Sequence, residues 1–323
     1  MIIGLIAPGF KPLPPQGWGA VESIVWDYYE NLLKRNIDVH IINQSNPNNI
    51  VTECNSKKYD IIHIMYDDYI CVTPYLNCKK ILYTSHFAYI THPSFNINYA
   101  HYYNGIFKKV IEYQHLIHAN VISEDIKQIY QKHGFSCSNN IKVICNGARE
   151  DLFKYSENPM FPNKSIYLAK IELRKRQYKY QNIPNIDFVG NLFNSTFNST
   201  NPNYLGEWDK PKLYENMTEY ANLILLSEGE ADPLVVKEAL IAGLGVVISE
   251  CASANLDLSR DFITIIPNAK LDDIDYVTME IEKNRRISIQ KRSEIRKYAL
   301  KHFAWNKIID NYLELITKEL MYK

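Results

Sequence analysis

The sequence lacks the patterns that would tie it to a membrane, a zinc site or nucleic acid. Its six cysteines form no C-x-x-C pair and have no histidine at zinc-ligand spacing, which favours free thiols and a cytoplasmic setting. No apolar run approaches the roughly 20 residues needed to cross a bilayer, and the start MIIGLIAPGF has no basic segment or cleavage site typical of a signal peptide. Lys plus Arg and Asp plus Glu both number 36, so no excess charge indicates a nucleic-acid partner.

Two further features of the sequence concern a cofactor and a metal ion. No G-x-G-x-x-G follows the first apolar run, which disfavours an NAD-binding dehydrogenase. The acidic pair Asp67-Asp68 and the acidic run at residues 272–275 invite a metal site, but acidic clusters in loops are usually solvated. We therefore favour the interpretation without a metal.

Short apolar runs alternate with helical patterns along the whole chain, and this alternation is typical of β-α-β units and parallel sheets. In the first half the runs lie at residues 2–7, 39–42, 59–65, 80–84, 120–123 and 141–145. In the second half they lie at residues 165–168, 186–189, 221–226, 245–248 and 262–266. The sequence therefore predicts an α/β protein with two Rossmann-like domains that face each other across a cleft.

The amino-acid composition along the chain indicates where the predicted domains begin and end. Residues 151–164 contain two prolines and are interpreted as a linker, whereas residues 190–204 are rich in Asn, Ser and Thr and are interpreted as an exposed loop. From residue 274 onward the pattern is helical and charged. We predict a first domain over residues 1–155, a second over residues 156–302, and a final helix over residues 303–323 that packs back on the first domain.

The stretch LSEGEADPLVVKEALIAGLGVVISE carries two carboxylates, Glu230 and Glu238, eight residues apart. It predicts a strand end, a polar loop, a helix that opens near Pro233 and stops at Gly243, and a further strand. Free N–H groups at the helix start would favour a phosphate or a sugar oxygen, and Glu238 would point back toward the loop. This arrangement suits a sugar nucleotide, although the spacing alone fits two solvated glutamates equally well.

Four motifs in this order resemble one enzyme family. They are PPQGWGAVE at residues 14–22, NGAREDLF at 146–153, YLAKIELRKRQ at 167–177, and the two-glutamate stretch just described. In these motifs, and over most of its length, the sequence resembles the retaining GT-B glycosyltransferases, in particular the E-x7-E family of the group 1 or family 4-like type.

The resemblance implies a retaining, metal-independent, hexosyltransferase-like enzyme. It would move a sugar from a nucleotide-diphosphate donor, a UDP- or GDP-sugar, to a hydroxyl of a glycan, lipid or small acceptor. The first domain would be the acceptor side and the second the donor side, with no cofactor, no metal and no nucleic acid involved. The basic stretch at residues 285–301 is expected to pack on its own domain, with weak contact to an anionic membrane as the alternative. The oligomeric state is left open.

The resemblance also implies roles for single residues. Glu238 would hold the ribose hydroxyls, and Glu230 would contact the transferred sugar. Lys170 and Lys175 would neutralise the diphosphate, and His86 would stabilise the reacting sugar. His86, Glu230 and Lys175 are the expected catalytic residues. The expected donor-binding set is Gly17, Gly19, Lys170, Lys175, Glu230, Ala231, Asp232, Pro233, Leu234 and Glu238.

The sequence departs from the family pattern at several of these positions. Lys170 replaces an arginine, Arg176 replaces a glycine, and Ala231-Asp232-Pro233 replaces the commoner Gly-Phe-Gly, which makes Asp232 a candidate for sugar specificity. These substitutions keep open a catalytically silent scaffold that binds a sugar nucleotide or a glycan. A sugar-nucleotide epimerase of the same two-domain architecture is the other alternative, although no set of acid/base residues in the sequence demands it. His63, inside an apolar run, is predicted to be a core residue.

Overall fold

The computed structural model describes residues 1–17, 19–92, 95–194 and 196–321. The chain divides into two compact units, the first made of Met1–Asn146 with Ile308–Lys323 and the second of Gly147–Lys307. The domain limits expected at residues 155 and 302 stay a prediction, and residues 322–323 of the predicted final helix lie outside the described part of the chain.

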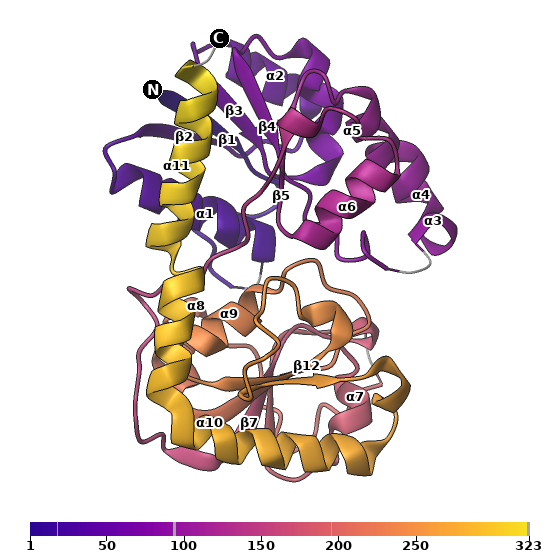
Figure 1. Cartoon of the computed structure of the whole chain (residues 1–323), viewed down its shortest axis with the longest axis vertical. Helices are drawn as coiled ribbons and strands as arrows, with labels where there is room; N and C mark the ends of the chain where they lie inside the picture. The colour runs from indigo at the N-terminus through magenta and orange to yellow at the C-terminus, as the bar shows by residue number, and fades with distance from the viewer. Residues whose placement is uncertain (18, 93–94, 195, 322–323) are drawn as a thin grey trace. The chain divides into compact units, whose positions relative to one another are not determined.

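The first unit is built on a six-stranded, fully parallel sheet in the order β2-β1-β3-β4-β5-β6 (Figure 1). The strands overlap the six predicted apolar runs. The four inner strands are almost wholly buried, as expected for a parallel sheet covered on both faces, whereas the edge strands β2 and β6 are partly exposed. Their bounds are β1 Ile2–Ile6, β2 Asp38–Ile42, β3 Ile61–Ile64, β4 Lys80–Tyr83, β5 His118–Val121 and β6 Ile141–Val143. The helices between them are α1 Ala20–Leu33, α2 Pro47–Asn55, α3 Phe95–Asn98, α4 Ala100–Tyr102, α5 Lys108–Glu112 and α6 Glu124–Lys132.

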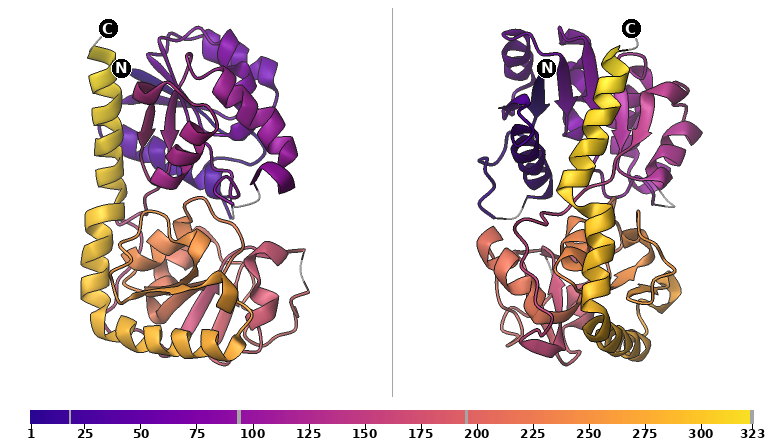
Figure 2. Two further views of the ribbon diagram at one scale, coloured as in Figure 1. Left: turned by 45° about the vertical axis from the view of Figure 1, so that its right-hand side comes forward. Right: turned by 60° about the vertical axis from the view of Figure 1, so that its left-hand side comes forward.

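The last helix, α11 (Trp305–Met321), runs alongside this first sheet (Figure 2). Tyr312 of α11 stacks on the ring of His63 in β3, with 5.6 Å between ring centroids. His63 is fully buried, its Nε2 lies 2.8 Å from Thr84 Oγ1, and burial lowers its pKa to about 3. The prediction that His63 is a core residue is therefore confirmed, and the residue is neutral.

The second unit contains a five-stranded, fully parallel sheet in the order β13-β12-β11-β7-β9. The bounds are β7 Phe161–Leu168, β9 Ile186–Val189, β11 Tyr220–Leu225, β12 Gly245–Ser249 and β13 Ile263–Ile266. A small parallel pair, β8 (Ile171–Glu172) and β10 (Leu192–Asn194), lies apart from this sheet. The α/β class with two parallel sheets, predicted from the sequence, is confirmed.

Two sequence interpretations are corrected in this unit. The linker predicted over residues 151–164 is wrong at its end, because β7 already begins at Phe161 and pairs there with Tyr220 of β11. A register irregularity beside this pair accommodates Pro162, which has no N–H to donate. The loop predicted over residues 190–204 contains β10, and its Phe197 is buried against Phe188.

The longest helix of the second unit, α10 (Ile274–Phe303), packs against β7, β11, β12 and β13. Its Arg292 is fully buried and donates to the carbonyl oxygens of Ser156 and Tyr220, at 2.6 and 2.9 Å. Arg285 likewise donates to Ser165 Oγ. The basic stretch thus directs two of its arginines into its own unit. The shorter helices of this unit are α7 Gln177–Tyr180, α8 Lys210–Asn216 and α9 Leu234–Ile241.

The helices also bear on the question of a membrane. Across the described residues, no helix combines the length and apolar character needed to span a membrane.

Candidate functional site

The second sheet changes direction between β7 and β11. From β7 the chain proceeds to β9 on one side, and from β11 it proceeds to β12 and β13 on the other. In open α/β sheets the loops that leave the two strands at such a switch point separate and leave room for a ligand at the carboxyl edge. The loop after β7 carries Lys170 and Lys175, and the loop after β11 carries Glu230.

Hydrogen bonds to backbone groups hold these two loops together. The Tyr167 hydroxyl accepts a hydrogen bond from the Leu226 N–H at 2.9 Å and donates one to the Lys175 carbonyl. The Glu228 N–H donates to the Arg174 carbonyl, also at 2.9 Å. These contacts fix the register of the two loops, so the charged side chains that the loops carry have defined neighbours.

The helix α9 follows the β11 loop, as the sequence predicts. Pro233 precedes it in an extended conformation, and the N–H groups of its first turn have no carbonyl within the helix to bind. Gly243 ends the helix at φ +87°, where its N–H donates to the Leu240 carbonyl at 3.1 Å. The predicted helix start and glycine stop are therefore confirmed, and the positive end of the helix dipole lies beside the loop that holds Glu230.

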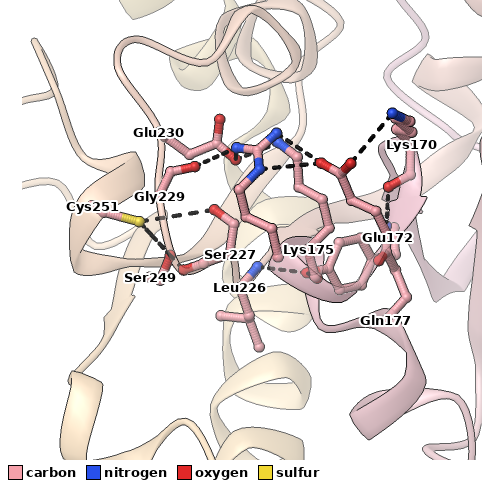
Figure 3. A network of polar contacts seen from close by, with 12 residues as sticks. Lys170, Glu172, Lys175, Gln177, Leu226, Ser227, Gly229, Glu230, Ser249 and Cys251 are labelled. Carbon is pink, nitrogen blue, oxygen red and sulfur yellow. Dashed lines mark hydrogen bonds and ion pairs between the residues drawn. The ribbon is translucent and has the colours of Figure 1, made fainter. Parts of the chain in front are cut away.

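The centre of the charged group is an ion pair between Lys175 Nζ and Glu230 Oε1 (Figure 3). Both side chains are largely buried, with 11% and 8% of their surface exposed. A second cation, Arg174, has its Nη1 3.6 Å from the same Glu230 oxygen and also donates to the Gly229 carbonyl. One carboxylate is therefore shared by two cations.

The pKa values follow from this sharing. Burial acts to raise the pKa of Glu230, but Lys175 and Arg174 outweigh it and hold the pKa below its usual value, so Glu230 is ionised. The pKa of Lys175 is also lowered, because burial and the repulsion from Arg174 exceed the attraction of Glu230. Glu230 thus faces two cations, and one of them, Arg174, also contacts Glu172.

Lys170 and Arg174 are joined by a second carboxylate, that of Glu172. Lys170 Nζ lies 3.4 Å from Glu172 Oε2 and stands over the ring of Phe193. Arg174 binds Glu172 Oε1 through Nε at 3.1 Å and Nη2 at 2.8 Å. Figure 3 shows the Glu172 carboxylate between Lys170 and the pair of Lys175 and Glu230.

A glycine requirement sets the position of the Lys170 loop. Gly190, at the end of β9, has φ +154°, and a Cβ added there would lie 1.9 Å from the Ala169 carbonyl oxygen. The close approach lets the Ala169 N–H bind the Val189 carbonyl and the Ile171 N–H bind the Asn191 carbonyl. Any larger residue at position 190 would displace the segment that carries Lys170 and Glu172.

Glu238 lies in the second turn of α9 and is buried. Its Oε1 is 3.5 Å from Lys210 Nζ, at the start of α8. The structure thus gives the predicted ribose-binding carboxylate a cationic neighbour from another helix.

Asp232 has a different environment from Glu230, although the two lie only two positions apart in the chain. Its fully buried carboxylate forms an ion pair with Lys237 of α9 and accepts a hydrogen bond from Asn255 Nδ2 at 3.0 Å. Ala231 is also buried beside it. A role for Asp232 in sugar specificity stays a prediction.

Three predicted site residues belong to the first unit. Gly17 lies in the loop after β1, and Gly19 caps α1 with φ 149°, where a Cβ would lie 2.7 Å from Glu22 Oε2. Trp18, between them in the predicted glycine motif, lies outside the described residues. His86 follows β4, and its backbone N–H donates to Asp67 Oδ2 at 3.2 Å. The roles of these residues stay predictions.

Asp67 belongs to a buried polar cluster of the first unit. Its carboxylate accepts hydrogen bonds from the hydroxyls of Ser85, Tyr102 and Tyr83. Burial raises its pKa, against the effect of these donors. In the part of the chain that the structure describes, no three His, Cys, Asp or Glu side chains come together in a way that could hold a metal ion.

Sequence reasoning missed Arg174, Glu172 and Lys210. Arg174 lies within the basic run Arg174-Lys175-Arg176, where the pattern alone does not distinguish a site residue from a solvated one. A signal was present for Glu172, because the alternation of Lys170, Glu172 and Arg174 puts opposite charges next to one another along a short segment. Nothing in the sequence connects Lys210 with Glu238.

The chain was compared with protein families, with curated proteins and with solved structures. No family model matches the chain, and no curated protein matches it. Among solved structures, HepE of Anabaena in complex with UDP and glucose is 15% identical, with 98% of this chain and 100% of that chain covered and a TM-score of 0.72. Sucrose-phosphate synthase of Thermosynechococcus elongatus is 14% identical, with 100% of both chains covered and a TM-score of 0.76.

A third similar structure is AviGT4, a glycosyltransferase involved in avilamycin A biosynthesis, at 13% identity and a TM-score of 0.70, with 100% of this chain and 98% of that chain covered. At such low identity the likeness concerns the fold. The chain has the α/β fold with parallel sheets that is found in GT-B glycosyltransferases.

Proposed function

We propose that the protein is a glycosyltransferase that moves a sugar from a nucleotide-diphosphate donor to a hydroxyl acceptor, with retention of configuration at the anomeric carbon. The observation that carries this proposal is the charged group at the β7/β11 switch point. There, Lys175 and Arg174 share Glu230 next to the first turn of α9. The likeness in fold to HepE, which was solved in complex with UDP and with UDP-glucose, supports it.

Sugar transfer requires that the leaving nucleoside diphosphate be stabilised. When the glycosidic bond breaks, the nucleoside diphosphate gains negative charge, and cations together with helix N–H groups stabilise that charge more in the transition state than in the ground state. Lys175 and the start of α9 would serve this step, with Lys170 as a second lysine for the diphosphate. Glu230 would contact the transferred sugar, Glu238 would accept from the ribose hydroxyls, and a donor phosphate oxygen would take the acceptor proton.

The proposal includes independence from metal ions and from cofactors. Because the lysine and arginine side chains supply fixed positive charge, no divalent ion is needed to balance the diphosphate. Transfer or hydrolysis of the donor is expected to proceed at an unchanged rate when EDTA is added. A loss of activity on chelation that Mg²⁺ or Mn²⁺ restores would contradict this part of the proposal.

The main test is a screen of UDP-, GDP- and dTDP-sugars for binding and slow hydrolysis by the purified protein. We expect one of them to bind and to be hydrolysed, and Glu230→Ala and Glu238→Ala to abolish hydrolysis. Glu228→Ala is the matched control, because this half-exposed carboxylate in the same loop pairs with Arg176. Binding of none of the donors would refute the proposal, and binding without hydrolysis or transfer would favour the silent scaffold.

A further inference from the structure

The bridge made by Glu172 resembles the contacts of a bound phosphate. One carboxylate oxygen, Oε1, accepts from both Nη2 and Nε of Arg174, at 2.8 and 3.1 Å, and the other, Oε2, lies 3.4 Å from Lys170 Nζ. A guanidinium and an ammonium are also the groups that bind phosphate oxygens through charge-assisted hydrogen bonds. Glu172 therefore occupies the hydrogen-bonding groups that an anionic ligand would use.

The bridge is more accessible than the ion pair beside it. The side chains of Lys170, Glu172 and Arg174 are 22%, 16% and 24% exposed, whereas those of Lys175 and Glu230 are 11% and 8% exposed. A ligand can thus reach the bridge with less rearrangement than the pair.

The backbone of Glu172 is held although its side chain is accessible. Glu172 ends β8, where it pairs with Asn194 of β10, and has an extended conformation. The 3₁₀ turn Leu173–Lys175 follows directly and carries Arg174. Rotation of the Glu172 side chain can therefore release both cations without a change in the backbone.

The charges around the bridge show which carboxylate an anionic ligand would replace. Three cations, Lys170, Arg174 and Lys175, stand against two carboxylates, Glu172 and Glu230. Glu230 is buried between Lys175 and Arg174, so Glu172 is the carboxylate that can be exchanged. A diphosphate that binds to these cations must compete with it.

We propose that Glu172 is an internal counter-anion that occupies Lys170 and Arg174 in the empty protein and is displaced by the diphosphate of the donor. This inference depends on the proposed function, since it assumes that the β7/β11 switch point binds a nucleoside diphosphate. The exchange weakens binding of the leaving nucleoside diphosphate, because Glu172 recovers its two cations when that product departs. Arg174 is thereby a diphosphate-binding residue.

The test compares Glu172→Gln with the wild type by titration calorimetry with UDP and with GDP at low salt. Removal of the competing charge is expected to tighten binding of the nucleoside diphosphate about three- to tenfold, in the range of a charge-assisted hydrogen bond in a partly exposed setting. Binding of uridine or guanosine, which lack the phosphates, is expected to stay the same. A purely structural role for Glu172 predicts weaker or unchanged binding of UDP and GDP, and either result would overturn the inference.

Glu228→Gln is the matched control. It removes one negative charge from the neighbouring loop, and the wild-type Glu228 carboxylate pairs with Arg176 instead of with Lys170 or Arg174. Its effect on UDP or GDP affinity is expected to be below about twofold. In an Arg174→Gln background the gain from Glu172→Gln should shrink, and a full gain there would overturn the role of Arg174. If Glu172→Gln folds poorly, Glu172→Ser serves the same comparison.

A failure of the proposed function and a failure of the role of Glu172 give different results. If the wild type binds neither UDP nor GDP, the proposed function fails and the inference fails with it. If the wild type binds one of them and Glu172→Gln does not bind it more tightly, the inference alone is overturned.

Discussion

Two buried lysine–carboxylate pairs flank the same loop of the second unit, and they differ in how completely their charges are compensated. In the pair of Lys237 and Asp232, 1% and 0% of the side-chain surface is exposed, and Asn255 supplies a further hydrogen bond to the carboxylate. In the pair of Lys175 and Glu230, 11% and 8% is exposed, and Arg174 competes for the carboxylate.

The difference separates a structural contact from a binding group. The Lys237–Asp232 pair joins the β11 loop to α9 and has one cation for one anion, so it has no charge left for a ligand. The Lys175–Glu230 pair lies at the sheet edge with cationic charge in excess. Burial of an ion pair is thus no sign of a site by itself, whereas a group in which cations outnumber carboxylates favours an anionic ligand.

The largest expected effect is on folding stability. Lys237→Met leaves the Asp232 carboxylate buried without its cation, and is expected to lower the free energy of unfolding by about 3–5 kcal/mol. Chemical denaturation with urea, followed by circular dichroism, measures this loss. The double variant Lys237→Met/Asp232→Leu removes both charges and should recover much of the stability, and a double variant as unstable as the single one would refute the account.

The next effect is on ligand affinity. Lys175→Ala is expected to weaken UDP or GDP binding about 10- to 100-fold, because a charge-assisted contact to the diphosphate is lost. Unfolding stability should fall less than in Lys237→Met, since Arg174 still faces Glu230. Calorimetric titration and urea denaturation of the same preparation test both statements. A loss of stability equal to that of Lys237→Met would remove the distinction between the two pairs.

The smallest effect concerns pH. Because the pKa of Lys175 is lowered, its ammonium loses its proton at a lower pH than an ordinary lysine, and affinity for UDP or GDP should fall as pH rises through that value. Bound diphosphate raises this pKa, so binding at alkaline pH should take up protons. Titrations in buffers of different ionisation enthalpy measure this uptake. Lys175→Arg, which stays charged, should show neither the fall nor the uptake.

The parallel sheets and the positions of their strands along the chain are largely predictable from the sequence. Apolar runs such as residues 2–7 and 245–248 are continuous because both faces of a parallel strand are covered, and Gly243 marks the end of a helix because only glycine readily takes φ > 0 there. The two-glutamate spacing also places Glu230 in a loop and Glu238 on the following helix.

Partners of charged side chains are far less predictable. Asp232 and Glu230 look alike in the sequence, and only the fold directs one toward Lys237 and the other toward Lys175 and Arg174. The contact between Arg174 and Glu172 depends on a short 3₁₀ turn and on the pairing of β8 with β10. The strand β10 lies inside a stretch whose composition predicts a loop. Such contacts depend on tertiary structure and have no periodic signal in the chain.

The first unit is made of two separate segments of the chain, and this has a practical consequence for expressing the unit alone. Tyr312 packs on the rings of His63 and Tyr28, yet 249 positions of chain separate it from His63. A fragment ending at Asn146 would therefore leave these two rings uncovered, whereas residues 147–307 form one continuous piece. Recombinant expression of the first unit calls for a fusion in which the segment from Ile308 is rejoined to Asn146 by a flexible linker.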